Sequence, residues 1–268
     1  MGTPLLWRMP LLRPLYAGAV LGARLASLAA PSGSKLGRGG RGRKASGERL
    51  RAWAARHRDP ARPLVWIHAP SVGEGLQARA VLAALRSARP DLQAVFTHFS
   101  PSAEALAASM VGAEADAAGY LPWDLARPCR RMLGALRPQA LVFTKTEVWP
   151  VLAGAARAAG VPTLLVAGTL PEGAGRLGWP ARALLRPAFA GLARVCAISA
   201  DDAERFARLG VSEARVEVTG DPGVDSAGER VDAADPDAPY LAPFRDGGAP
   251  WWVAGSTWPA DEAVVVDA

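Results

Sequence analysis

The fold is predicted by one stretch, Trp66-Ile67-His68-Ala69-Pro70-Ser71-Val72-Gly73-Glu74. An apolar run of strand length stops at Pro70, and the next residues are a hydroxyl side chain, small residues and a carboxylate, which is how many helices begin. The stretch therefore predicts a buried strand that passes through a tight turn into a helix.

The same unit recurs along the chain after Pro63. Runs rich in Val, Ile and Phe predict strands at Leu64–Ala69, Leu92–Thr97, Ala140–Thr144, Thr163–Ala167, Arg194–Ile198 and Arg215–Thr219. Ala- and Leu-rich stretches predict helices near Gly73–Ala88, Pro101–Met110, Leu125–Leu136, Val148–Ala159, Pro180–Ala190 and Asp201–Leu209. This alternation indicates an α/β fold, a Rossmann-like domain over residues 63–221 with a parallel sheet covered on both faces. Its ligands are expected at the carboxyl ends of the strands.

Composition and motifs exclude several classes of protein. Of the 268 residues, 50% are hydrophobic and 21% are charged, which is not the composition of a disordered chain. The 2 cysteines, Cys129 and Cys196, have no CxxC spacing, which excludes a zinc ribbon and a disulfide scaffold and fits a reducing cytosol. The absence of Walker, GxGxxG, HExxH and GxSxG motifs argues against P-loop hydrolysis, a typical dinucleotide site, zincin chemistry and an esterase nucleophile.

Positive charge is concentrated in an N-terminal arm, residues 1–62. The arm contains 13 Lys and Arg but only Glu48 and Asp59 as acids, whereas the rest of the chain is mildly acidic. We interpret residues 32–62, which are rich in glycine and charge, as a flexible basic linker attracted to anionic lipid headgroups. An RGG-like contact with nucleic acid is the weaker interpretation, because no aromatic residue is interleaved among the arginines of residues 32–44 and the following domain is acidic.

The first 31 residues are expected to associate with a membrane. Leu11–Ala30 is largely apolar but is interrupted by Arg13 and Arg24, and a spanning helix needs about 20 apolar residues. A helix in the membrane interface, a tilted span and an ordinary packed helix are the alternatives. The absence of a clean cleavage site disfavours a signal peptide.

The C-terminal region suggests a second domain. Residues 222–248 are rich in Asp, Pro and Ala without strong periodicity, as in an interdomain linker. Residues 249–268 then restart the pattern of strand, small-residue loop and helix. We interpret this part as the first elements of an incomplete α/β domain, and the chain as a truncated one.

Glu74 has two interpretations. Ser71 and Glu74 have the S-x-x-E spacing of a capping box, in which each side chain satisfies a free amide of the first helical turn. The same position lies at the crevice above the first strand, where a carboxylate can take a proton from a substrate hydroxyl. Both roles are compatible if substrate displaces the cap.

Two further strand ends face the same crevice. Lys145 and Glu147 follow the third predicted strand, where the lysine can hold the carboxylate ionised or contact an anionic substrate, unless they form only a surface ion pair. Ser100 begins a helix after the second strand, as a cap or an anion-binding site. We expect His68 to be a satisfied core histidine, whereas His98 at a strand end is better placed for a site.

Six short segments follow one another along the chain. They are Trp66-Ile67-His68-Ala69 with Ser71-Val72-Gly73-Glu74, Tyr120-Leu121-Pro122-Trp123-Asp124, Thr146-Glu147-Val148-Trp149-Pro150, Asp202-Ala203-Glu204-Arg205-Phe206 with Leu209-Gly210, Val218-Thr219-Gly220, and Ala254-Gly255-Ser256-Thr257. Together they resemble the 3-deoxy-D-manno-octulosonic acid (Kdo) transferases of lipopolysaccharide assembly, from about Leu15 to the last residue. Those enzymes have two Rossmann-like halves in the GT-B arrangement, so the resemblance implies an N-terminal, acceptor-binding half here.

The resemblance also implies the reaction. Kdo would pass from cytidine monophosphate (CMP)-Kdo to a lipid A precursor at the cytoplasmic face of the inner membrane, without cofactor, metal or nucleic acid. Glu74 matches the family's catalytic glutamate, the general base on the acceptor in an inverting displacement. We expect Ser71, Gly73, Ser100, Lys145 and Glu147 to bind substrate, and Gly255, Ser256 and Thr257 to bind the nucleotide sugar.

This chain departs from the family pattern at several positions. Lys145 stands where the family usually has glutamate, and Thr169 stands where it has an arginine. Asp221 and Gly223 replace an asparagine and a lysine, and Trp258 replaces a histidine. We expect the 268-residue chain to be inactive alone, because a GT-B enzyme holds its substrates between two halves and most of the nucleotide-binding half is absent here. The alternatives are a related glycosyltransferase with a changed sugar or acceptor and a non-catalytic binding module at the membrane surface.

Overall fold

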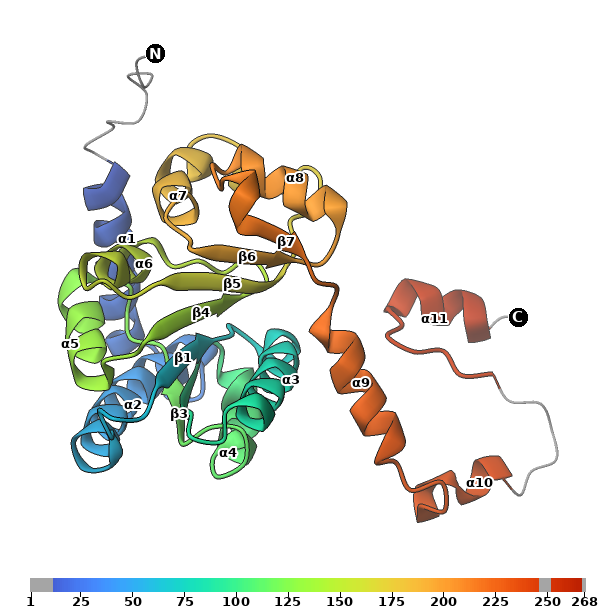
Figure 1. Ribbon diagram of the computed structural model, residues 1–268. Helices are drawn as coiled ribbons and strands as arrows, with labels where there is room; N and C mark the ends of the chain where they lie inside the picture. Colours follow the sequence, from blue (N-terminus) through green and yellow to red (C-terminus); the bar gives the residue numbers. More distant parts are fainter. Residues whose placement is uncertain (1–11, 246–251, 267–268) are drawn as a thin grey trace. The chain divides into compact units, whose positions relative to one another are not determined.

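A computed structural model describes residues 12–245 and 252–266 (Figure 1). Contacts divide the chain into two units, residues 1–227 and 228–268. The elements of the first unit are α1 (Leu12–Ala29), α2 (Lys35–His57), β1 (Leu64–His68), α3 (Val72–Ala88), β2 (Gln93–His98), the 3₁₀ helix η2 (Pro101–Ala103), α4 (Glu104–Met110), β3 (Ala117–Tyr120), α5 (Ala126–Leu136), β4 (Ala140–Thr144), α6 (Pro150–Ala158), β5 (Thr163–Gly168), η3 (Gly175–Leu177), α7 (Ala181–Phe189), β6 (Arg194–Ala197), α8 (Ala200–Arg208), η4 (Glu213–Arg215) and β7 (Val216–Val218). Helix α9 (Pro222–Asp232) crosses the division.

Within the described residues, seven strands form one parallel sheet in the order β3-β2-β1-β4-β5-β6-β7. This is the predicted Rossmann-like topology, and the six predicted strands are confirmed. β3 was missed. From β1 the chain runs outward to β2 and β3, then returns to start β4 on the other side of β1, so the switch point of the sheet lies between β1 and β4.

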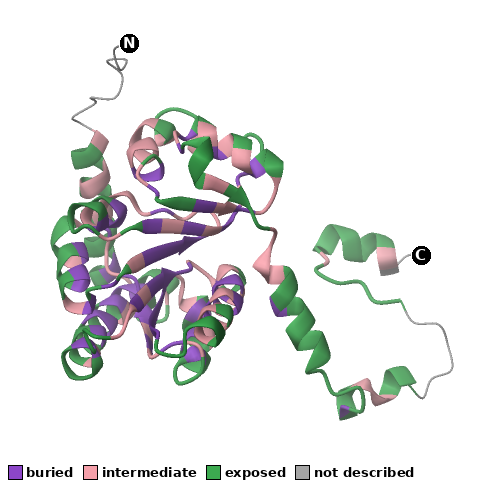
Figure 2. Ribbon diagram, in the orientation of Figure 1, coloured by how far each residue is buried: buried purple, intermediate pink, exposed green. Residues whose placement is uncertain are grey.

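The core has two layers because successive strand residues point to opposite faces of the sheet. Trp66 and Leu141 point into a cluster with residues of α2, α5 and α6, whereas Ile67 and Val142 point into a second cluster with α3 and α4. Figure 2 shows the central strands as the most continuously buried part of the unit. Rigid strands therefore position the loops at their ends.

The basic segment expected to be a flexible linker is instead the buried helix α2. Its glycines permit close packing: a Cβ on Gly42 would lie 2.3 Å from the Tyr120 ring. Gly119 of β3 likewise leaves room for Ser46, which accepts a hydrogen bond of 2.7 Å from the Tyr120 amide. The prediction was wrong because composition alone does not show that a glycine faces a neighbour at close range.

An arginine of α2 is buried among aromatic rings. The Arg43 guanidinium carbon lies 3.9 Å from the Phe99 ring centroid and 4.8 Å from that of Trp123, and one of its nitrogens donates to the Phe99 carbonyl over 2.9 Å. Burial lowers the pKa of Arg43 to about 10. Phe99 stacks in turn on Trp149, so α2 supports the loops that follow β2 and β4.

Helix α1 contacts the rest of the unit through few buried groups. The Tyr16 hydroxyl donates to the buried carboxylate of Asp124 over 2.8 Å. Exposed leucines lie along the helix, namely Leu15, Leu21, Leu25 and Leu28. Among residues 12–245 and 252–266, no helix has the length and apolar character needed to cross a bilayer. The first eleven residues of the predicted membrane-associating segment lie outside the described residues.

In the second unit, η5 (Pro239–Leu241), α10 (Ala242–Arg245) and α11 (Pro259–Val266) are short helices. The predicted linker thus begins as helix α9 and contains further helical turns. The predicted strand at the start of the second domain is not found in residues 252–258, and residues 250–251 lie outside the described part. A parallel strand needs a neighbouring strand to pair its amides, and the described residues of this unit contain none.

Candidate active site

The candidate site lies at the switch point of the sheet, where β1 and β4 end side by side. The backbone at Glu74 follows β1, and Lys145 follows β4 directly. The Thr144 hydroxyl donates to the His68 carbonyl over 3.0 Å, which ties the two strand ends together. The two residues predicted to face one crevice are therefore brought together.

Glu74 lies in the first turn of α3 and is held on both carboxylate oxygens. Lys145 Nζ lies 3.3 Å from Oε1, and the Ser71 hydroxyl donates to Oε2. The capping-box prediction was wrong in detail, because the Ser71 side chain forms no cap hydrogen bond and is bound to the carboxylate instead. The Glu74 side chain is 15% exposed, so it is partly buried but still reaches solvent.

The surroundings of Glu74 favour its ionised form. Burial raises the pKa of its carboxyl, but hydrogen bonds from Ser71 and from its own backbone amide, together with the charge of Lys145, lower it more. The net pKa lies below the ordinary value for glutamate. At neutral pH the group is therefore a carboxylate, the form that accepts a proton.

Lys145 is held in an unusual backbone conformation. Its φ of 61° is left-handed, which is uncommon for a residue with a Cβ, and its amide donates to the Val166 carbonyl over 2.9 Å. The side chain is 43% exposed and reaches Glu74 rather than Glu147. The expected pairing of Lys145 with Glu147 was therefore wrong.

Arg176 is the site residue that sequence reasoning missed. It lies in η3, and its guanidinium pairs with the carboxylate of Glu147. Thr169, which stands where the family has an arginine, instead donates its hydroxyl to Asp202 over 3.2 Å. No sequence signal distinguished Arg176 from other surface arginines.

The other predicted residues of this edge have mainly local contacts. The amides of Phe99 and Ser100 both donate to the Pro70 carbonyl, which holds the loop after β2 against the turn before Ser71. The Ser100 hydroxyl accepts from the Ser102 amide over 3.3 Å as a cap. Gly73 lies exposed in the first turn of α3 with open space around its Cβ position.

The histidines divide between core and surface pocket. His68 is fully buried: Nε2 accepts a hydrogen bond of 3.1 Å from the Trp149 indole, and Nδ1 donates to the Thr97 carbonyl over 2.9 Å. Burial lowers the pKa of His68 to about 3, so it is a neutral core histidine, as expected. His98 lines a small pocket beside Tyr120, and its Nδ1 bonds the Ser100 carbonyl.

The residues predicted to bind a nucleotide sugar lie in the second unit. Gly255 and Ser256 are exposed, Ser256 has a φ of 59°, and Thr257 donates to Glu262 over 2.9 Å. Asp221, at another position that departs from the family pattern, belongs to the first unit and accepts from Gln77 over 2.7 Å. The described residues contain no group of three His, Cys, Asp or Glu side chains arranged to hold a metal ion.

The fold and the topological switch point of its sheet define a class: the Rossmann-like N-terminal half of a GT-B protein. Solved structures with this fold include the UDP-N-acetylglucosamine 2-epimerases of Rickettsia bellii and Methanocaldococcus jannaschii. Each has a TM-score of 0.51 and 12% identity; the matches cover 69% and 70% of this chain and 51% and 54% of those chains, respectively.

The family model for 3-deoxy-D-manno-octulosonic-acid transferase (kdotransferase) matches residues 44–226, and the chain belongs to this family of glycosyltransferases. It is 34% identical to the 3-deoxy-D-manno-octulosonic acid transferase of Bordetella pertussis over 163 residues, 59% of this chain and 37% of that protein. The corresponding Haemophilus influenzae transferase is 24% identical over 204 residues, 75% of this chain and 47% of that protein. The chain thus spans less than half the length of either relative.

Proposed function

We propose that this chain is the acceptor-binding half of a Kdo transferase, with Glu74 as the general base. The observation that carries the proposal is a partly exposed, ionised carboxylate at the switch point of a Kdo transferase domain. The donor is CMP-Kdo and the acceptor is a hydroxyl of a lipid A precursor. The 268 residues alone bind the acceptor without completing transfer, because a GT-B enzyme holds its two substrates between two halves.

The chemistry is one inverting displacement. The acceptor oxygen forms a bond to the anomeric carbon of Kdo while the bond from that carbon to the phosphate oxygen of CMP breaks, and the hydroxyl proton passes to Glu74. CMP leaves with the bonding electron pair and needs little acid assistance. One correctly placed carboxylate is then sufficient for proton transfer, without an obligatory metal or cofactor.

Ser71 and Lys145 position the base before the acceptor arrives. The Ser71 hydroxyl occupies one carboxylate oxygen, and an acceptor hydroxyl must replace it there or approach the same oxygen from the exposed side. Lys145 holds the other oxygen and remains partly exposed, so its ammonium group is also available to an anionic group of a substrate. Where the family usually has glutamate, this lysine favours an acceptor or donor with negative charge at that point.

Membrane association is the second part of the proposal. The leucines exposed on α1 and the basic residues of the first 62 positions support an association of the enzyme with the anionic, cytoplasmic face of the inner membrane, where a lipid acceptor is expected. We propose a surface association through α1.

The direct test is Glu74→Gln in the complete gene product. Kdo transfer from labelled CMP-Kdo to a lipid A precursor should fall by about 10²–10⁴-fold, the contribution of a general base. Glu147→Gln is the comparison variant, because it removes a more exposed carboxylate, 32% against 15% for Glu74, that pairs with Arg176 and is not the proposed base; its loss of activity should be the smaller one. A Glu74→Gln enzyme that is folded and fully active would show that another group accepts the proton.

A second prediction concerns pH. Lys145→Met should raise the pKa of Glu74, since the lysine charge lowers it, so the acid limb of the kcat/KM profile should move to higher pH. Arg176→Met, which removes the cation beside Glu147, should leave this limb in place. If neither variant moves the limb, the group that titrates is not Glu74.

A further inference from the structure

A large open cavity lies among the helices of the first unit. It has a volume of about 800 Å³ between α1, α5, α6 and α7. Its wall runs from Ala126 and Pro150, which begin α5 and α6, to Thr163, which begins β5. Glu74 and Lys145 are not among its lining residues, so the cavity is separate from the candidate active site.

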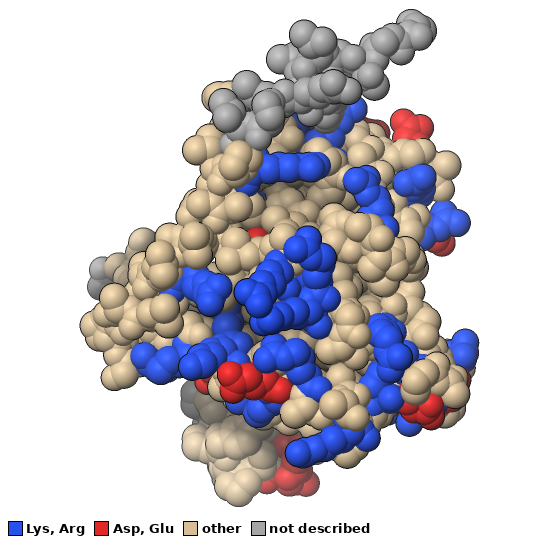
Figure 3. Space-filling model, turned by 90° about the vertical axis from the view of Figure 1, so that its left-hand side faces the viewer, with Lys and Arg blue, Asp and Glu red and all other residues tan. Residues whose placement is uncertain are grey.

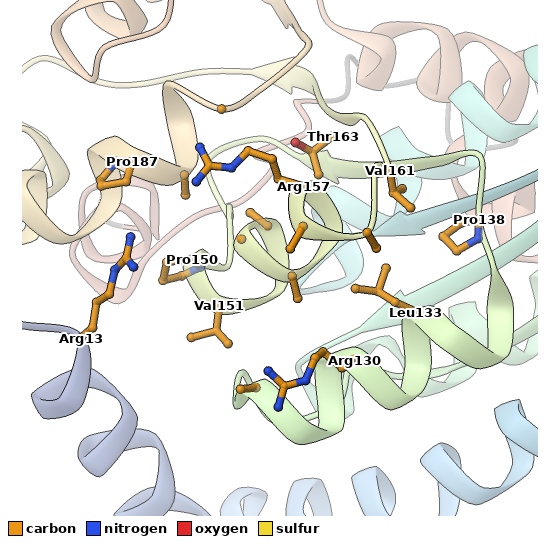
Figure 4. Close-up of a pocket in the computed structure, with 18 of the residues that line it drawn as sticks. Arg13, Arg130, Leu133, Pro138, Pro150, Val151, Arg157, Val161, Thr163 and Pro187 are labelled. Atoms are coloured by element: carbon orange, nitrogen blue, oxygen red, sulfur yellow. The ribbon is translucent and has the colours of Figure 1, made fainter.

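The wall of this cavity combines two kinds of side chain. Arg13, Arg130 and Arg157 come from three different helices, and Figure 4 shows them around a lining that includes Leu133 and Val151. A fourth arginine, at position 137, also lines it, and none of the described lining residues is acidic. Positive charge thus surrounds an apolar interior.

The arginines of the cavity wall have no acidic partner in the part of the chain that the structure describes. Among the described residues, the side chains of Arg13, Arg130, Arg137 and Arg157 form no hydrogen bond and no ion pair. By contrast, Arg176 and Lys145 at the candidate active site are paired with carboxylates. Four unpaired guanidinium groups at one cavity favour an anionic ligand, and guanidinium groups suit phosphate oxygens in particular.

The surroundings of the cavity indicate which anion. Figure 3 views the side of the molecule that carries α1, α2, α5 and α6, where Lys and Arg side chains far outnumber acidic ones. Leu15, next to Arg13 and Tyr16 of the cavity wall, is exposed, and the exposed leucines of α1 continue from it. An anionic phosphate head with an apolar body matches this combination, whereas an RNA backbone leaves the apolar lining unused.

We propose that this cavity binds one anionic phospholipid, with its phosphate among Arg13, Arg130 and Arg157 and its apolar part against Leu133 and Val151. Most of these residues belong to α5 and α6, and only Arg13 belongs to α1. It extends the membrane association proposed above but does not depend on the transfer reaction or on Glu74.

The test compares two charge-matched variants of the full chain. Arg130→Gln with Arg157→Gln removes two cavity arginines; Arg131→Gln with Arg208→Gln removes two exposed arginines that do not line the cavity. Sedimentation with phosphatidylglycerol-containing vesicles should show a loss of affinity of about tenfold or more for the cavity pair and under about twofold for the control. Equal losses, or no loss, would overturn the proposal.

A second variant fills the cavity without changing its charge. Gly134 and Gly154 lie in its wall on α5 and α6, and a Cβ at either position meets nothing within 4 Å. Gly134→Leu with Gly154→Leu should weaken vesicle binding at least fivefold while leaving circular dichroism and thermal unfolding near wild type. Gly228→Leu, which has similar space outside the cavity, is the control. Unchanged binding in the filled variant would mean that charge alone attracts the membrane.

The same proteins distinguish lipid from nucleic acid. Binding to phosphatidylcholine vesicles and to a short single-stranded RNA should be weak in every variant. Tight RNA binding that both cavity variants abolish would overturn the assignment to a phospholipid. All of these readouts are independent of Kdo transfer, so a failed transferase assay leaves this proposal standing.

Discussion

Helices α1 and α2 are neighbours in sequence and contact each other. In each of them, burial is the opposite of what its composition suggests. Helix α1 is apolar, but Ser27 is its single buried residue within Leu12–Ala29, and its leucines face solvent. Helix α2 is rich in glycine and arginine, but eight of its residues are buried, including Arg43. Hydropathy alone would assign the two helices the other way round.

The difference shows that burial here depends on how closely backbones approach. The glycines of α2 let its backbone lie against Tyr120 and β3, where larger side chains would collide. Helix α1 has no such tight contact along its leucines, so their apolar surface stays exposed and can contact a membrane. Substitutions in the two helices should therefore differ in their effect on the free energy of unfolding.

The largest effect is expected at Gly42. Gly42→Ala places a Cβ 2.3 Å from the Tyr120 ring and should destabilise the protein by about 1–3 kcal/mol, despite the gain in helix propensity. Gly18→Ala in α1, where the Cβ meets nothing within 4 Å, should stabilise by up to about 1 kcal/mol. Urea denaturation measures both. The same sign for the two variants would contradict the contrast.

A smaller effect is expected at Arg43. Arg43→Met keeps the packed stem but removes the cation over Phe99 and the bond to its carbonyl, at a cost of about 1–2 kcal/mol. Arg24→Met on α1 should change stability by less than about 0.5 kcal/mol, since Arg24 is exposed. Thermal unfolding compares the two, and an equal effect would mean that the aromatic site around Arg43 contributes nothing.

The smallest change in stability is expected on α1, together with a large change in binding. Serine at all four exposed leucine positions should leave urea denaturation within about 1 kcal/mol of wild type but reduce partitioning to anionic vesicles by more than about tenfold. The control places serine at four exposed valines, Val111, Val224, Val231 and Val264. Removal of residues 1–62 is a poorer test, because it also deletes α2. Undiminished binding of the leucine variant would remove α1 from the membrane model.

Much of the fold could be predicted because most strands have a short apolar centre. All six residues of β2 are buried, for example, and Ala94-Val95-Phe96 forms its apolar centre. β3 was missed because Ala117-Ala118-Gly119-Tyr120 is short and small, and its glycine is explained only by Ser46 of α2. Helix α2 was missed for the same reason, since each segment is explained by the other and neither by itself.

Most members of the candidate site could be predicted, but Arg176 and the pairings could not. Glu74 and Lys145 follow adjacent strands, so the topology of a parallel sheet is sufficient to bring them together. Which carboxylate Lys145 contacts depends on its left-handed backbone, and which cation serves Glu147 depends on where the loop carrying Arg176 folds back. Neither follows from residue spacing.

The buried imidazole of His68, at the end of β1, has a practical consequence for enzymology. With a pKa of about 3 and both ring nitrogens occupied, His68 carries no charge at any pH at which the protein is normally assayed. A titration observed between pH 4 and pH 8 in substrate binding or turnover therefore originates from another group, on the rim of the crevice or in a substrate. The imidazole of His68 stays uncharged while these groups titrate.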